Sequence, residues 1–543
     1  MSVKMNLKPL CMKLNNYLFK SFALIFSGMI FLSCNSGPKA DLSQYAIIPI
    51  PISMADADGY FTIKAGTKIT SSPELSNEAQ FLRQQLKSLT SLEVDFEEGV
   101  SENVIEFVLS PNSVIPEEGY TLEVASEKIT ITGKTAAGIF WGTQTLVQLI
   151  PSVENRDFGP NPQFTIAAGM IEDHPEYEYR GMMLDVARHF FPVDEVKHLI
   201  DQISKYKINH LHLHLSDDQG WRIEIKSWPL LTEIGGSTQV GGEAGGYYTQ
   251  EDYKEIVRYA MERHMTIVPE IDMPGHTNSA LAAYGELNPG IKVPEEGAVA
   301  TERTRMGVAG QPTPLYTGTE VGFSTLDTKR PETYQFVEDV IREISEITPG
   351  PFFHIGGDES HVTEMEDYIP FIEKAQDLVT KYGKRTLGWD EVAHAQLLPT
   401  SVAQYWAKSE NAVMAIEQGA KVLISPATKV YLDMKYDSTT HIGLSWAATI
   451  ELDEAYNWDP TTLDEKIKRE HILGVEAPLW TETVTNRDDI EFLTFPRLAA
   501  IAEVAWSPKE KRDWNSFANR VARHGKRWES EGINFYRSPK VDW

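Results

Sequence analysis

The chain has 543 residues, of which 42% are hydrophobic, so it is long enough to bury the cores of two domains. Its 78 acidic residues outnumber its 50 basic residues, which gives a formal net charge of −28. This charge excludes nucleic acid as an expected partner, because phosphate backbones are bound by basic surfaces. The charged fraction of 24% and the aromatic fraction of 10% are those of a globular protein and exclude wholesale disorder.

The first 34 residues have the pattern of an export signal. Four lysines within the first 20 residues precede an apolar run over residues 22–32, which is too short to span a bilayer. The run ends in Ser33-Cys34, which resembles the site at which bacterial lipoproteins are cleaved and lipidated on cysteine. We therefore expect a lipoprotein-type signal peptide over residues 1–34, a linker over residues 35–44, and an exported bacterial lipoprotein of the periplasm or outer membrane. A conventional secretory peptide and an uncleaved anchor remain as alternatives.

Residues 45–172 have the pattern of a small α+β domain. The runs 61–69, 104–109 and 120–131 alternate between apolar and polar residues, which predicts strands. Residues 76–89 carry apolar side chains at helical spacing, and a second helical pattern runs from about 135 to 149 and ends before Pro151.

From about Tyr179 the pattern changes to a repeated strand, loop and helix. The eight candidate strands are 182–186, 208–215, 266–271, 352–355, 385–389, 402–406, 422–425 and 475–480. One intervening helix is predicted to begin after Thr249, with Asp252 three residues later as in a capping box. Eight such units over residues 173–543 predict a (β/α)8 TIM barrel of the α/β class, with its active site at the C-terminal ends of the strands. The stretch from about 288 to 322 is too long for an ordinary loop and predicts an insertion over the mouth of this site.

The predicted strand ends carry two kinds of side chain. Acids, histidines and one arginine follow the first four strands, and aromatic residues with four further acids follow the later ones. A cavity with carboxylates on one wall and flat aromatic faces on another suits a sugar, because rings stack on its C–H faces while hydroxyls make charge-assisted hydrogen bonds.

The centre of this pattern is His-Ile-Gly-Gly-Asp-Glu at residues 354–359. The two glycines allow a sharp turn after the strand and leave space beside the next side chains. Asp358 and Glu359 are poorly placed as an opposed pair of catalytic acids, because successive side chains of extended chain point to opposite faces. A division of labour is more natural: one acid protonates the leaving oxygen, and its neighbour steers another group. If that group is an N-acetyl group on the substrate, its carbonyl oxygen can attack the anomeric carbon. A purely structural acid pair on the barrel rim is the alternative.

From about Ile48 to its end, the sequence resembles the β-N-acetylhexosaminidases of glycoside hydrolase family 20. The matching motifs stand at residues 180–190, 207–222, 269–276, 354–359, 388–391, 431–433 and 480–482. The resemblance implies an exo-acting, retaining enzyme that removes terminal GlcNAc or GalNAc from oligosaccharides or glycoconjugates by substrate-assisted catalysis. It also implies no cofactor and no metal, and contact with a membrane through the lipid anchor only.

The resemblance further implies a role for each site residue. Glu359 is the general acid and then the base, and Asp358 orients the acetamido group. The expected substrate-binding residues are Arg188, Asp217, His276, Trp389, Trp406, Tyr431, Asp433, Trp480 and Glu482. Asp272 and His354 are expected to support them.

Two other functions are compatible with parts of the pattern. His212 and His214 share a strand face and could bind a metal together with Asp217, His276 and His354, as in metal-dependent barrel hydrolases. Against this, tryptophans stand where such sites usually supply a lysine on strand five and a histidine on strand six. The second alternative is a non-catalytic, glycan-binding surface lipoprotein, which the intact acid pair at residues 358 and 359 disfavours.

Overall fold

The computed structural model describes residues 41–151 and 162–543. The expected signal peptide, with Cys34, and most of the expected linker lie outside the described residues. Residues 40–543 form one unit, which contains a mixed sheet and a closed barrel. Among the described helices, none combines the length and the hydropathy needed to cross a bilayer.

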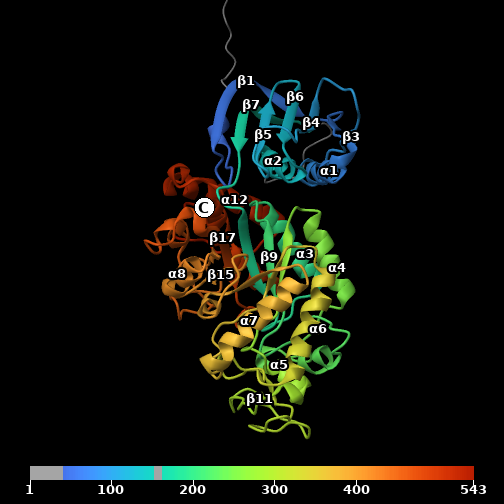
Figure 1. Cartoon of the computed structure of the whole chain (residues 1–543). Helices are drawn as coiled ribbons and strands as arrows, with labels where there is room; N and C mark the ends of the chain where they lie inside the picture. Colours follow the sequence, from blue (N-terminus) through green and yellow to red (C-terminus); the bar gives the residue numbers. More distant parts are fainter. Residues whose placement is uncertain (1–40, 152–161) are drawn as a thin grey trace, which may run out of the picture. The chain divides into compact units, whose positions relative to one another are not determined.

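The N-terminal part is a seven-stranded sheet with two helices on one face (Figure 1). Its strands are β1 (Ser53–Ile63), β2 (Lys68–Thr70), β3 (Asp95–Phe96), β4 (Val104–Leu109), β5 (Tyr120–Val124), β6 (Lys128–Gly133) and β7 (Phe164–Asp173), in the order β1-β7-β5-β6-β4-β2-β3. The helices are α1 (Ser76–Thr90) and α2 (Ala136–Leu149). Alternate residues of β4, β5 and β6 are buried against them, which explains the period of two in the sequence.

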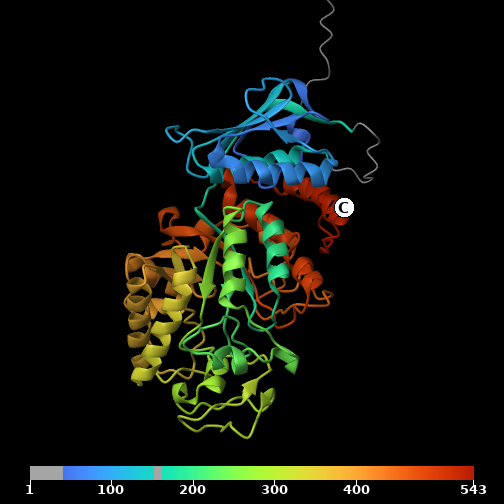
Figure 2. The ribbon, with the colours of Figure 1, turned by 90° about the vertical axis from the view of Figure 1, so that its right-hand side faces the viewer.

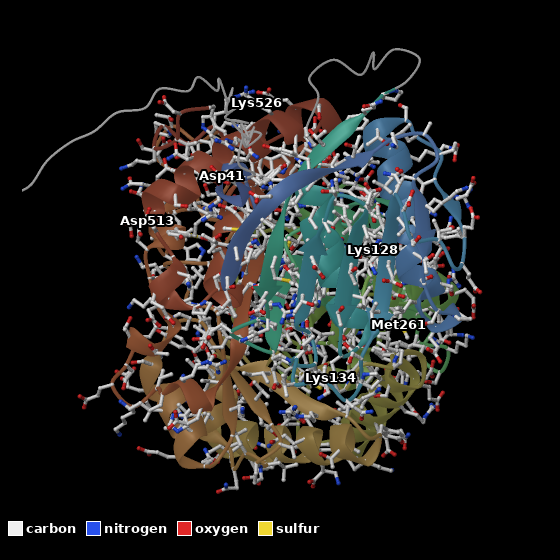
Figure 3. All side chains as sticks on the ribbon, turned by 90° about the horizontal axis from the view of Figure 1, so that it is seen from above. Asp41, Lys128, Lys134, Met261, Asp513 and Lys526 are labelled. Atoms are coloured by element: carbon white, nitrogen blue, oxygen red, sulfur yellow. The ribbon has the colours of Figure 1, made fainter. Side chains whose placement is uncertain are left out.

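The opposite face of this sheet carries polar side chains. In the view from above, Lys128 of β6 lies on this face (Figure 3), and its ammonium group lies 2.9 Å from Glu106 of β4. A sheet with one packed and one solvated face is common where antiparallel pairs are present, as they are here between β5 and its neighbours.

Two of the strand predictions for this domain are wrong in their extent. The run 61–69 contains the end of β1 and the start of β2, because the chain turns at Gly66, whose φ is +90°. The run 120–131 is likewise two antiparallel strands, β5 and β6. Alternation persists through the turn at Gly66, whereas between β5 and β6 the buried positions change from even to odd, a change of phase that marks the second turn.

The C-terminal part is a closed barrel of eight parallel strands, which confirms the predicted TIM barrel. The strands are β8 (Tyr179–Asp185), β9 (His210–His214), β10 (Thr266–Glu270), β13 (Phe352–His354), β14 (Arg385–Trp389), β15 (Val402–Tyr405), β16 (Lys421–Ile424) and β17 (Ile472–Leu479). Each of them overlaps one of the eight predicted strands, and β17 pairs with β8 to close the ring.

Helices cover the outside of the barrel (Figures 1 and 2). The longer ones are α3 (Val193–Ser204), α4 (Gln250–Met261), α6 (Pro331–Ile347), α7 (Met365–Lys381), α8 (Ser409–Glu417), α10 (Arg487–Thr494), α11 (Arg497–Trp506) and α12 (Trp514–Glu531). The capping box before α4 is confirmed, because the Thr249 hydroxyl accepts from the Asp252 N–H and the Asp252 carboxylate accepts from the Thr249 N–H. Between β16 and β17 a long segment replaces a regular helix; it contains the short helix α9 (Leu452–Tyr456) and two 3-10 helices, Pro460–Thr462 and Arg469–His471.

The segment 288–322 lies between α5 (Asn278–Ala283) and α6. It contains one short antiparallel pair, β11 (Ala298–Val299) with β12 (Leu315–Tyr316), which lies beside α5 (Figure 1). Its last residues, Thr319 and Val321, line the cavity at the C-terminal ends of the barrel strands.

A buried polar cluster joins the seven-stranded sheet to the barrel. Asp173, the last residue of β7, accepts hydrogen bonds from the Tyr120 hydroxyl at 2.8 Å and from the Trp506 indole at 3.0 Å. The Lys207 ammonium lies 2.8 Å from the same carboxylate, and neither side chain of this ion pair is exposed. Residues far apart in the sequence are therefore held together at one buried carboxylate.

Candidate active site

A cavity of about 340 Å³ opens at the C-terminal ends of the barrel strands. This volume lies at the small end of the range for small-molecule sites and suits one sugar residue. The cavity is lined by Arg188, Thr319, Val321, Asp358, Glu359, Trp389, Trp406, Tyr431, Asp433, Leu444, Trp446, Trp480 and Glu482. The expected catalytic pair therefore shares one cavity with most of the expected substrate-binding residues.

The two acids of the central motif are positioned by a sharp turn after β13. Gly356 and Gly357 both have positive φ values, +67° and +101°, and a Cβ at Gly356 would lie 1.8 Å from Asp272 Oδ1. Glu359 has φ +45°, which is uncommon for a residue other than glycine and is typical of a functionally constrained position. The turn directs both carboxyl groups into the cavity, as the two glycines predicted.

Asp358 lies in an environment that favours its protonated form. Burial raises its pKa well above the usual value, and the nearby Asp272 adds to the rise. Burial likewise raises the pKa of Asp272, whose Oδ1 accepts from the Gly357 N–H at 3.1 Å. Asp358 Oδ1 has no hydrogen-bond partner among the described residues, so this oxygen is available to a polar group of a ligand.

His276 lies directly behind the acid pair. Its Nε2 is 3.8 Å from Asp358 Oδ2 and 3.7 Å from Glu359 Oε2, while its Nδ1 is 3.2 Å from Asp217 Oδ1. Burial lowers the pKa of His276, but the Asp217 carboxylate outweighs it and raises the pKa to about 10. The imidazole is thus a buried cation beside the two acids. Neither His276 nor Asp217 lines the cavity, so the structure places these two expected substrate-binding residues behind its wall.

Arg188, Asp433 and Glu482 form a polar group in the lining of the cavity. The Arg188 guanidinium lies 2.9 Å from Asp217 Oδ2 and stands over the Trp480 ring at 4.8 Å. Both carboxylate oxygens of Asp433 and Oε2 of Glu482 are buried without a hydrogen-bond partner in the described part of the chain. Burial raises the pKa of both acids. Buried acceptors without partners are suited to the hydroxyl groups of a sugar.

Aromatic rings line much of the rest of the cavity. Trp389 and Trp480 lie 5.7 Å apart between ring centres, and Tyr431 lies 6.5 Å from Trp480. The indole N–H of Trp389 donates to Glu270 at 2.9 Å, and that of Trp406 donates to Glu391 at 3.0 Å.

The sequence did not reveal four of the lining residues: Thr319, Val321, Leu444 and Trp446. Trp446 is 57% exposed and stands edge-on to Trp406 at 6.0 Å and to Tyr431 at 6.1 Å. All four belong to the long segments between α5 and α6 and between β16 and β17, whereas the prediction used only residues close to strand ends. The unusual length of these segments was the one available signal.

The histidines that suggested a metal site form a hydrogen-bonded layer inside the barrel. Several groups of them lie close enough to share an ion, for example His212, Glu270 and His354. However, His214 lies between Glu270 at 2.5 Å and Asp217 at 2.9 Å, and His212 lies between Glu270 at 3.0 Å and Glu476 at 2.9 Å.

Two histidines of this layer favour the protonated form. Burial lowers the pKa of His212 and of His214, but the paired carboxylates outweigh it and raise these pKa values to about 9 and about 10. Hydrogen bonds to carboxylates therefore account for the positions of both imidazoles. His354 instead supports the turn of the central motif, because its Nδ1 accepts from the Gly356 N–H at 3.0 Å.

Comparisons with known proteins agree with this geometry. The family model for the catalytic domain of glycosyl hydrolase family 20 matches residues 177–368 and 360–509, and the model for domain 2 of the same family matches residues 44–174. A β-N-acetylhexosaminidase of Cellulomonas fimi is 40% identical over 510 residues, which cover 92% of this chain and 98% of that protein.

Solved structures of the family are similar over almost the whole chain. Streptomyces plicatus N-acetyl-β-hexosaminidase in complex with Thio-NAglucal superposes with a TM-score of 0.85 at 43% identity, covering 94% of this chain and 99% of that one. A mutant Streptomyces plicatus β-hexosaminidase in complex with the product GlcNAc gives 0.86 at 43% identity, covering 93% and 99%. The chain therefore belongs to glycosyl hydrolase family 20.

Proposed function

We propose that the chain is an exo-acting, retaining β-N-acetylhexosaminidase that removes terminal, non-reducing GlcNAc or GalNAc from oligosaccharides or glycoconjugates. The observation that carries this proposal is one cavity whose lining combines the acid pair Asp358–Glu359, aromatic rings and the polar group of Arg188, Asp433 and Glu482. A similar structure at 43% identity contains GlcNAc as product, which is consistent with a cavity for a single amino sugar.

The reaction uses the substrate's own acetamido group as nucleophile. Glu359 donates a proton to the glycosidic oxygen while the acetamide carbonyl oxygen attacks the anomeric carbon, so the leaving group departs and an oxazolinium-like ring forms. Asp358 accepts a hydrogen bond from the acetamide N–H and holds the carbonyl in line. Glu359, now a carboxylate, takes a proton from water as that water opens the ring, which restores the acid and leaves the product with its original β-configuration.

Exo action follows if Arg188, Asp433 and Glu482 bind the non-reducing end of the sugar. They offer a charged donor and buried acceptors to the hydroxyls of a terminal sugar. Trp389, Trp406 and Trp480 exclude water from the acetamide, which strengthens the remaining electrostatic contacts.

Turnover of an aryl β-N-acetylglucosaminide tests the proposal. We expect activity that survives a metal chelator and falls by about 10²- to 10⁴-fold in Glu359→Gln, because the general acid is removed. Glu364→Gln, which changes an exposed glutamate five residues away, is the matched control and should keep full activity. Loss of activity on chelation would favour a metal-dependent hydrolase, and no turnover by the folded wild type would favour a glycan-binding protein.

We also propose, from the sequence of residues 1–34, that the chain is exported and lipidated at Cys34. Incorporation of an alkyne-labelled fatty acid in a bacterial host tests this. We expect label in the wild type and in Cys11→Ser, and none in Cys34→Ser. Equal labelling of all three chains would contradict the proposal.

A further inference from the structure

Trp406 is the lining tryptophan whose backbone and side chain are each held by a separate acid. Asp390 accepts from the backbone N–H of Trp406 at 3.1 Å and from the Asn411 side chain at 2.6 Å. The next residue, Glu391, accepts from the Trp406 indole N–H at 3.0 Å. Asp390 thus holds the backbone of Trp406 in place, and Glu391 sets the orientation of its indole ring.

Glu391 acts from outside the cavity. It does not belong to the lining residues, whereas Trp406 does. The ring of Trp406 also contacts Trp446 edge-on at 6.0 Å, but Trp446 is itself 57% exposed and gives little lateral support. The ring packs in part against the hydrophobic core, and among the described residues its N–H is directed by the hydrogen bond to Glu391.

A second lining tryptophan, Trp389, also donates its indole N–H to a glutamate, but the surroundings of that glutamate differ. Trp389 is 1% exposed and donates to Glu270, whose carboxylate is surrounded by imidazoles. Burial raises the pKa of Glu270, but His214 and its neighbours outweigh it and hold the pKa well below the usual value. Glu391 lacks such a cationic partner among the described residues: burial raises its pKa to about 7, and Asp390 and Glu359 add to the rise. The Trp389 indole is thus held by a carboxylate whose charge is balanced by neighbouring histidines. The Trp406 indole is held by a carboxyl group that has no cationic partner among the described residues.

We propose that Glu391 is a positioning residue that holds the Trp406 indole against the acetamide and thereby sets the size of the N-acyl group that the enzyme accepts. This inference rests on the proposed function, because it assigns the aromatic rings of the lining to the acetamide side of the cavity. The carbonyl oxygen of the acyl group must approach the anomeric carbon in one orientation, and a displacement of about 1 Å can cost about 100-fold in rate. A fixed ring excludes acyl chains longer than acetyl, and a released ring admits them while it positions the acetyl group less well.

Three aryl β-glycosides of glucosamine, carrying N-acetyl, N-propionyl and N-butyryl groups, test this with purified full-length chain. In Glu391→Leu we expect kcat on the N-acetyl substrate to fall by about 10- to 100-fold, with a smaller fall or a gain on the N-butyryl substrate, so that the ratio of the two rates shifts by at least about 10-fold. Glu391→Gln keeps an oxygen that accepts from the indole and should retain the wild-type order of the three substrates. Glu410→Leu removes an exposed carboxylate from α8 close by in the sequence and should change neither rate nor selectivity.

Two outcomes would overturn the inference. One is an equal loss on all three substrates in a folded Glu391→Leu, and the other is a Glu391→Gln variant whose selectivity changes as much as that of Glu391→Leu. If Glu391→Leu does not fold, Trp406→Phe removes the N–H donor and keeps a ring, and it should relax acyl selectivity in the same direction; unchanged selectivity there also overturns the inference. A wild type that does not turn over the N-acetyl substrate would contradict the proposed function itself, so the two failures are distinguishable.

Discussion

Two tryptophans of the cavity differ sharply in how far they are buried. Trp389 is 1% exposed at the end of β14, whereas Trp446 is 57% exposed on the long segment after β16. In the proposed reaction, a buried ring with its N–H satisfied would provide a fixed surface beside the acetamide. An exposed ring beside the mouth offers a face to whatever lies outside the cavity, which in an exo-acting enzyme is the leaving group.

Replacement of Trp446 by alanine therefore should weaken binding of the leaving group. We expect KM for a β-linked N-acetylglucosamine disaccharide to rise by about 2- to 13-fold, which corresponds to the about 0.5–1.5 kcal/mol of an aromatic contact. A methyl N-acetylglucosaminide has no second ring and is the internal control. An equal rise in KM for both substrates would show that Trp446 acts on the bound sugar and not on the leaving group.

The turn after β13 shows how one element places several groups at once. Gly356 has φ +67°, and its missing Cβ leaves room for Asp272, which in turn contacts Asp358. Strand β13 ends at His354 beside the cavity, and the turn that follows places both Asp358 and Glu359 in the cavity lining.

Gly356→Ala should therefore impair both catalysis and stability, because a Cβ there would also lie 2.7 Å from the backbone Cα of Asp272. The new Cβ would lie 1.8 Å from Asp272 Oδ1, and we expect kcat to fall by about 100-fold as the acid pair is displaced. Gly419→Ala is the matched control, because Gly419 has φ +86° and no neighbouring atom lies within 4 Å of the position that a Cβ would take there. The control should lose about 1 kcal/mol of stability and keep its kcat. Equal kcat values in the two variants would mean that the close approach to Asp272 does not position the acids.

The elements were predicted from the sequence to different degrees. The eight barrel strands and the residues at their ends could be predicted because each strand is a short apolar run followed by polar residues. The chain reversal at Gly66 was missed, because alternation continues through it. Trp446 and Thr319 were missed because long segments reach the cavity through tertiary packing, which no local period encodes. The position of Asp217 and His276 behind the wall also depends on packing between strands.

At the scale of the whole molecule, the seven-stranded sheet and the barrel depend on the buried pair Asp173–Lys207. Asp173→Asn keeps the shape of the side chain but leaves the Lys207 ammonium buried without its counter-charge. We expect the free energy of unfolding to fall by about 3–5 kcal/mol in urea denaturation. Glu93→Gln, which breaks the exposed pair with Lys87, should cost at most about 1 kcal/mol. A loss in Asp173→Asn as small as that in the control would contradict this role of the pair.

The protonated imidazoles inside the barrel predict how stability varies with pH. His276 and His214 have pKa values of about 10 in the folded protein against about 6.5 in the unfolded chain. Because the folded state retains these protons, their contribution is fully present below about pH 6.5 and is lost as the pH rises toward 10. His210 and His524, whose burial lowers their pKa values to about 3, act only below pH 6.5 and do not offset this loss.

Urea denaturation at pH 6.5 and pH 9.5 measures this effect. We expect a lower free energy of unfolding at pH 9.5, and a smaller difference between the two pH values in His276→Asn. An equal pH dependence in both chains would contradict the assignment of a retained proton to His276.

The central claim is that the substrate's acetamido group replaces an enzymatic nucleophile, steered by Asp358 while Glu359 protonates the leaving oxygen. Comparison of kcat/KM for an aryl β-N-acetylglucosaminide and the matching aryl β-glucoside tests it most directly. The account predicts efficient turnover of the first and a loss of several orders of magnitude for the second, because the glucoside has no internal nucleophile. Comparable turnover of the two glycosides would contradict it.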